Sequence, residues 1–250
     1  MKHQHKKLYI VNLSLITVII IGWALYSWIQ VGKFPDKLWV HRANSIEKWM
    51  EQSTLYPNAE IDLLFLEDDG KYHVAHDSVD VDKLILDNYF QHLRCRDGKL
   101  WLDIKNLTNE NYLTALNELN LLCQNYEIDK NRLIIESDNS EALSHFKCDG
   151  GYFTSYYLRA PRPTSLSSAE IEKTIKNLQS IVDSKTVSAL SFPHYWYDEI
   201  RTHLNRNISL LTWDHHTSEF IFHFSFWKRQ MLCDSQVKII LIKSKENYHR

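Results

Sequence analysis

From residue 38 onward, short apolar runs alternate with longer segments in which apolar residues recur every three or four positions. The first pattern is typical of buried strands and the second of amphipathic helices. Strands are predicted at residues 38–43, 59–66, 100–105, 132–136, 151–158, 187–192, 208–213 and 237–242. Helices are predicted at residues 45–53, 81–93, 108–126, 140–146, 167–184, 195–204 and 218–232, the last being rich in aromatic residues.

Strands that alternate with helices predict an α/β fold, here a (β/α)8 TIM barrel with a parallel core. An open, doubly wound sheet fits the same alternation. Nucleotide-binding folds are disfavoured, because the chain has six glycines and no glycine-rich phosphate loop after a predicted strand. Asp69-Gly70 is a hairpin turn signal after the second strand, with residues 72–75 as its return strand. Thr108 is the expected N-cap of helix 108–126.

The N-terminal pattern is different, since residues 8–31 carry no charge and follow a basic tip with Lys2, Lys6 and Lys7. A helix of that length spans a bilayer. A cleavable signal peptide is the alternative, but no small-x-small cleavage site follows the apolar run. We therefore expect residues 1–32 to form a cytoplasmic tip and a transmembrane anchor. Residues 33–250 then form the barrel domain on the extracytoplasmic side, because basic flanks stay in the cytoplasm.

The formal net charge is −2, and removing the basic tip leaves the rest more acidic. A nucleic-acid-binding surface is therefore not expected. The four cysteines, Cys95, Cys123, Cys148 and Cys233, contain no CxxC pair, which disfavours a zinc site made of cysteines. Their spacing does not decide between free thiols and two disulfides in an exported domain.

Polar residues interrupt the apolar strands at a few positions. Glu60 and Asp62 lie in strand 59–66, where alternation points both side chains to one face. Two adjacent carboxylates repel each other, and a divalent cation with oxygen ligands is the simplest way to stabilise them. His41 ends the first strand and His76 follows the hairpin, and both have the right chemistry for proton transfer beside that metal.

Other strand ends are also polar. Asp103 and Lys105 share a face at the end of strand 100–105, either as site residues or as a buried ion pair. Glu136 ends the next strand and is open to a salt bridge, for example with Lys105, or to metal binding. Trp213 ends strand 208–213. In a TIM barrel the active site lies at these carboxyl ends.

The order of these motifs resembles the glycerophosphodiester phosphodiesterase family of the phospholipase C-like TIM-barrel superfamily. That family has His-Arg-Gly on the first strand, Glu-x-Asp on the second, His-Asp after the hairpin, Glu-Ile-Lys on the third and Trp-Thr near the seventh. The corresponding residues are His41-Arg42-Ala43, Glu60-Ile61-Asp62, His76-Asp77, Asp103-Ile104-Lys105 and Trp213-Asp214.

This resemblance implies a phosphoric diester hydrolase acting on a glycerophosphodiester or a related phospholipid-derived substrate in lipid metabolism. The residues it implies are His41 and His76 as the acid–base pair, Glu60, Asp62 and Asp103 as ligands of Mg2+ or Ca2+, and Arg42, Lys105 and Trp213 as substrate contacts.

The sequence also departs from the family pattern. Ala43 replaces the glycine, Asn44-Ser45 stands where Glu-Asn-Thr is expected, and the third acid is the shorter Asp103. The small subdomain usual after His-Asp is absent, as in the compact sphingomyelinase D-like and menorin-like members. The alternative function is a catalytically silent barrel that binds a lipid headgroup, a glycan or a protein at the cell envelope. Metal binding would separate this alternative from the enzyme.

Overall fold

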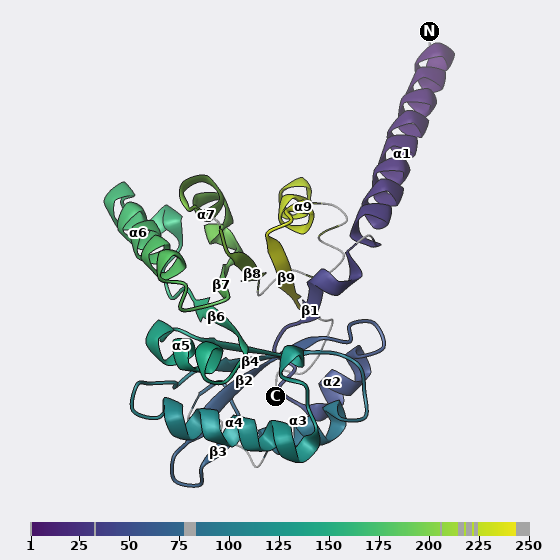
Figure 1. Cartoon of the computed structure of the whole chain (residues 1–250). Coiled ribbons are helices and arrows are strands. Elements are labelled where there is room, and N and C mark those ends of the chain that lie inside the picture. Colours follow the sequence, from purple (N-terminus) through teal and green to yellow (C-terminus); the bar gives the residue numbers. More distant parts are fainter. Residues whose placement is uncertain are drawn as a thin grey trace.

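The computed structural model describes residues 2–32, 34–77, 84–205, 207–214, 218, 222 and 225–243. Its strands are β1 (Leu38–Val40), β2 (Ala59–Leu66), β3 (Lys71–Val74), β4 (Leu100–Ile104), β5 (Leu133–Ser137), β6 (Phe153–Tyr157), β7 (Ala189–Pro193), β8 (Ser209–Trp213) and β9 (Val237–Ile242). Its helices are α1 (Lys2–Gly32), α2 (Ile46–Gln52), α3 (Leu86–Leu93), α4 (Tyr112–Tyr126), α5 (Ser140–Cys148), α6 (Ser168–Ser184), α7 (Tyr197–His203) and α9 (Phe226–Cys233) (Figure 1).

The strands form one closed barrel. Their order is β1-β9-β8-β7-β6-β5-β4-β2, and β1 pairs with β2 through Val40 and Ala59 to close the ring. All these pairings are parallel. Strand β3 instead runs antiparallel to the C-terminal half of β2. The predicted TIM barrel is therefore confirmed, and the open doubly wound alternative is wrong because the sheet closes on itself.

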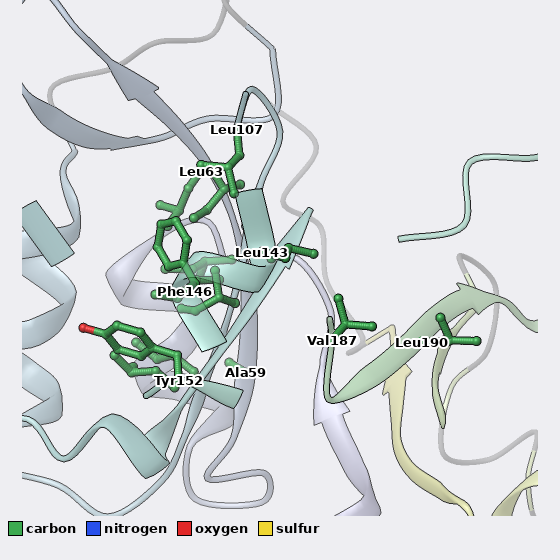
Figure 2. Close-up of a cluster of buried hydrophobic side chains, with 14 of the residues drawn as sticks. Ala59, Leu63, Leu107, Leu143, Phe146, Tyr152, Val187 and Leu190 are labelled. Carbon is green, nitrogen blue, oxygen red and sulfur yellow. The ribbon is translucent and has the colours of Figure 1, made fainter. Parts of the chain in front are cut away.

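The hydrophobic core has two layers. The smaller layer joins alternate strand residues that share the inner face, among them Trp39, Trp101, Leu211 and Trp213. The larger layer lies between strands and helices, as expected when helices cover a parallel sheet. Figure 2 shows part of it, with Leu143 and Phe146 of α5 directed toward the strands. Because both faces of the strands are covered, carboxylates on the inner face lie in a buried environment.

Local signals explain several element ends. Ser45 caps α2 through the Lys48 amide, and Ser167 and Glu170 form a capping box at α6. Gly70 adopts φ 68° in the predicted turn between β2 and β3. The Thr108 cap is wrong: α4 begins at Tyr112, because the Thr108 hydroxyl instead accepts hydrogen bonds from the amides of Glu110 and Asn111 in the preceding turn.

Two predicted helices fall partly outside the described residues. The helix predicted at 81–93 is described from Leu86 as α3, and residues 81–83 of the prediction are not described. The helix predicted at 218–232 corresponds to α9 from Phe226, and most of its predicted first half is not described.

Helix α1 projects away from the barrel (Figure 1). Among the described residues it is the one helix long and apolar enough to cross a membrane, over Val11–Ile29, a property that signal sequences share. Arg229 of α9, which is 7% exposed, lies over the Trp23 ring at 4.6 Å and donates a hydrogen bond to Ser27. Lys37 Nζ donates to the carbonyls of Leu232 and Asp234 at 2.9 and 2.8 Å. The C-terminal end of α1 and the segment after it therefore contact α9 and the residue that follows it.

Candidate active and metal site

Three carboxylates meet inside the barrel, two from the first half of β2 and one from the carboxyl end of β4. Glu60 and Asp62 come from β2, and Asp103 comes from β4, where it is the register partner of Asp62. Each can place one oxygen within 4.8 Å of the others, and their exposures are 2%, 1% and 7%. Alternation along β2 puts the first two on one face, and the parallel register adds the third. Buried carboxylate oxygens converging in this way match the donor set that Mg2+ and Ca2+ take.

The segment after β1 is tied to these carboxylates. The Arg42 amide donates to Glu60 Oε2 at 2.6 Å, and the Ala43 amide donates to the Glu60 carbonyl at 2.8 Å. Arg42 adopts φ 52°, a left-handed conformation that is strained in a residue with a side chain. This turn places Arg42 Nε 3.6 Å from Asp62 Oδ2 and leaves His41 Nε2 3.8 Å from Glu60 Oε2.

Asn44 completes this connection and was not predicted as a site residue. Its Nδ2 donates to Asp62 Oδ2 at 2.8 Å, and its Oδ1 accepts from the Asp62 amide at 3.0 Å. The side chain therefore fixes both the backbone and the carboxylate of one proposed ligand. The neighbouring Ser45 provides the cap of α2, whereas Asn44 faces β2.

Lys105 lies among the carboxylates. Its Nζ is 2.7 Å from Asp62 Oδ1 and also donates a hydrogen bond to Asp103 Oδ2. Burial would lower the pKa of Lys105, but the nearby Asp103 and Asp62 raise it above its usual value. The ammonium therefore stays charged, and this ion pair joins β4 to β2.

The carboxyl groups differ in their electrostatics. Burial, reinforced by Asp62, raises the pKa of Glu60 well above its usual value. Burial also raises the pKa of Asp103, with Lys105 acting in the opposite direction. Burial would raise the pKa of Asp62 too, but the charge and hydrogen bond of Lys105 hold it below its usual value. Of the three groups, Asp62 is therefore the most firmly ionised.

Glu136 of β5 is a fourth buried acid. It is the register partner of Asp103 and is 2% exposed. Burial, with the Asp103 charge second, raises its pKa well above the usual value. Its Oε2 has no hydrogen-bond partner within the part of the chain that the structure describes.

A cavity of about 500 Å3 opens over Asp103 and Lys105. His76 and Asp77 lie on its wall, and His76 Nδ1 is 3.0 Å from Asp77 Oδ2. Tyr157, Asp138 and Arg159 also line the cavity, and the last two form an ion pair at 3.1 Å. These three residues were not predicted, because nothing in the order of the sequence motifs marks them.

Trp213 lies behind the cavity wall. It is 6% exposed and stacks on Tyr157 with ring centroids 5.1 Å apart and planes at 12°. The predicted substrate contact by Trp213 would therefore act through Tyr157. A second, larger cavity of about 810 Å3 lies between α6 and α7, lined by residues such as Ile171 and His203 and separate from the carboxylates.

No family model matches the sequence, and no curated protein matches it. Solved structures do match the fold. A glycerophosphodiester phosphodiesterase from Parabacteroides distasonis has a TM-score of 0.57 and 16% identity, with 82% of this chain and 91% of that chain covered. A phosphodiesterase from Oleispira antarctica, solved with the product sn-glycerol-3-phosphate, has a TM-score of 0.53 and 11% identity, with 84% and 94% covered. The chain thus has the barrel fold of these phosphodiesterases.

Proposed function

We propose that this chain is a membrane-anchored, metal-dependent phosphodiesterase that hydrolyses a glycerophosphodiester or a related phospholipid-type diester. The observation that carries the proposal is the buried cluster of Glu60, Asp62 and Asp103 beside a cavity. Histidines lie on two sides of that cluster, His41 close to Glu60 and His76 on the cavity wall with Lys105 and Asp103. The fold shared with known phosphodiesterases supports the same reaction.

The proposed metal ligands are Glu60, Asp62 and Asp103, because hard divalent cations favour buried carboxylate oxygens that converge. When bound, Mg2+ or Ca2+ would hold the phosphodiester and stabilise charge that develops on its oxygens. Arg42 and Lys105 would bind phosphate oxygens, as guanidinium and ammonium groups do.

The two histidines carry the proton transfers. One of His41 and His76 accepts the proton of the attacking hydroxyl as the new P–O bond forms, and the other protonates the leaving alcohol as the old P–O bond breaks. The attacker is water or a neighbouring hydroxyl of the substrate. Attack by the substrate hydroxyl would give a cyclic phosphate. Asp77 orients His76 by holding its Nδ1 at 3.0 Å.

Residues 1–32 would anchor the enzyme, with the tip in the cytoplasm and the barrel of residues 33–250 outside. The apolar span of α1 and the basic residues before it support this topology. The contact of Arg229 with Trp23 and Ser27 would then place α9 near the bilayer surface.

The test is hydrolysis of a panel of glycerophosphodiesters and lysophospholipids by the full-length chain in detergent, with Mg2+, with Ca2+ and with a chelator. His41→Ala and His76→Ala should each abolish turnover while circular dichroism remains that of the folded protein. His203→Ala, on the exposed face of α7, is the matched control and should retain activity. Turnover close to that of the wild type in either active-site variant would contradict the assignment.

A catalytically silent barrel is the second candidate. It is favoured by Lys105, whose ammonium pairs with both Asp62 and Asp103 without a metal. Isothermal titration of the full-length protein with Mg2+ and Ca2+ separates the two functions. Absence of metal binding together with absence of turnover would support the silent barrel.

A further inference from the structure

We propose that Lys105 is an internal cation that occupies the place of the metal and must leave its carboxylates before a divalent ion binds. This inference rests on the proposed metal site and adds an exchange between two cations. A metal would need oxygen atoms of Asp62 and Asp103, and the inference follows from the contacts that these atoms already make.

The contacts of Asp62 show which of its oxygens can be released. Its Oδ2 accepts from Asn44 Nδ2 at 2.8 Å and faces Arg42 Nε at 3.6 Å, while its Oδ1 faces Lys105 Nζ at 2.7 Å. Both oxygens therefore already have donors. The Asn44 contact is fixed by a second hydrogen bond to the Asp62 backbone, so Oδ1 is the oxygen that can be released.

Asp103 shares the same cation. The Lys105 ammonium donates to its Oδ2. One ammonium thus joins two of the three carboxylates whose oxygens converge within 4.8 Å. An ammonium and a divalent ion that shared the same pair of oxygens would repel each other at close range in this buried site, so we infer that binding of one moves the other.

Lys105 also has space into which it can move. Its side chain is 22% exposed, and it lines the cavity of about 500 Å3 that opens above Asp103. A lysine side chain has a flexible four-carbon stem, so its ammonium can rotate into that cavity without moving β4. In the cavity it would meet the phosphodiester, and metal loading would thereby release the cation that binds the substrate phosphate.

The exchange predicts that removing the ammonium tightens metal binding. Isothermal titration of the full-length protein in detergent with MgCl2 and CaCl2 should give a dissociation constant at least about tenfold lower for Lys105→Met than for the wild type. Arg42→Gln is the matched control, since it removes one positive charge near Asp62 without releasing Oδ1. Its side chain is 43% exposed and screened by solvent, so its effect should be several-fold smaller.

A measurement on the wild type covers the case in which Lys105→Met does not fold. Acetylation with a small reagent, followed by mass spectrometry, should modify Lys105 slowly without metal and several-fold faster with saturating Mg2+. The exposed Lys173 of α6 is the internal reference and should react equally under both conditions.

The outcomes separate the two proposals. Metal binding by the wild type with unchanged Lys105 reactivity, or equal tightening by Arg42→Gln and Lys105→Met, would overturn the exchange and leave the metal-dependent enzyme standing. Absence of metal binding by both the wild type and Lys105→Met would overturn the metal site and the exchange together.

Discussion

At the scale of single residues, the site depends on three buried carboxylates, Glu60, Asp62 and Asp103, whose oxygens converge within 4.8 Å. Alternation along β2 was enough to place Glu60 and Asp62 on one face, and they do lie together. The grouping with Asp103 followed from the family resemblance. The role of Asn44 could not be predicted, because its two hydrogen bonds to Asp62 depend on the path of the turn after β1. The catalytic and binding roles themselves stay predictions.

Glu136 gives the first prediction, which concerns stability and pH in the presence of a chelator. Burial raises the native pKa of Glu136, and a glutamate in an unfolded chain has a pKa of about 4.3. Above about pH 4 the unfolded state loses this proton before the native state does, so ionisation favours unfolding. The free energy of unfolding falls by about 1.4 kcal/mol for each pH unit above the unfolded pKa, until the pH exceeds the native pKa.

Glu136→Gln removes the pH-dependent fall in the free energy of unfolding, because glutamine does not ionise. The side-chain amide of the glutamine can still donate a hydrogen bond to Asp103. The melting temperature of the variant should equal that of the wild type near pH 4 and exceed it increasingly as the pH rises toward the native pKa of Glu136, by ~2–4 °C for each kcal/mol. Thermal unfolding followed by circular dichroism measures the difference. Glu172→Gln, on the exposed side of α6, is the control and should show no such trend. A constant difference at all pH values would exclude the ionisation of Glu136 as the cause.

At the scale of elements, the predicted β2 has the observed bounds Ala59–Leu66, and the other barrel strands agree to within a few residues. Strands were predictable because short, continuous apolar runs bounded by turn signals are typical of buried strands. Helix starts were less predictable. The shift of α4 from Thr108 to Tyr112 arises because the side chains of Thr108 and Asn111 form a turn of their own, and sequence patterns do not separate that turn from a cap.

Tyr89 of α3 gives the second prediction, which links an element to the site. Its hydroxyl donates to the Ala43 carbonyl at 2.6 Å, in the turn that carries His41 and Arg42. Tyr89→Phe leaves this buried carbonyl without its donor, at a cost of about 1–3 kcal/mol. We expect lower stability together with weaker metal binding and lower turnover, because the turn also holds Glu60 through the Arg42 amide.

Tyr72→Phe is the matched control. The Tyr72 hydroxyl donates to the Ala115 carbonyl at 2.7 Å, equally buried but on the outer layer next to α4. It should reduce the melting temperature by a similar amount and leave metal affinity unchanged in calorimetry. If both variants weakened metal binding equally, the effect of Tyr89 would be one of general stability.

At the scale of the whole molecule, the alternation of elements indicated a parallel α/β fold but left closure open. Closure depends on the pairing of Val40 with Ala59, a contact between the first two strands that no periodicity encodes. The attachment of α1 to α9 is likewise a tertiary property. Nothing near Arg229 in the sequence indicates that its guanidinium lies against Trp23 and Ser27, which lie in the N-terminal helix.

The side of the membrane on which the barrel lies is the third prediction, and the cysteines can report it. Cys95, Cys148 and Cys233 are exposed, whereas Cys123 is buried. With the N-terminal tip in the cytoplasm, a membrane-impermeant maleimide should label the exposed thiols in intact spheroplasts after mild reduction with an impermeant reductant. Labelling is detected by a mass shift of the full-length chain.

The control is the triple variant with serine at positions 95, 148 and 233. It keeps Cys123, which is 5% exposed and should react only after denaturation. If the wild type were labelled only after the membranes had been permeabilised, the barrel would lie in the cytoplasm and the proposed topology would be reversed. Because the labelling requires no turnover, it tests the anchor independently of the metal site, and a barrel found outside would limit its substrates to diesters present at the outer face of the membrane.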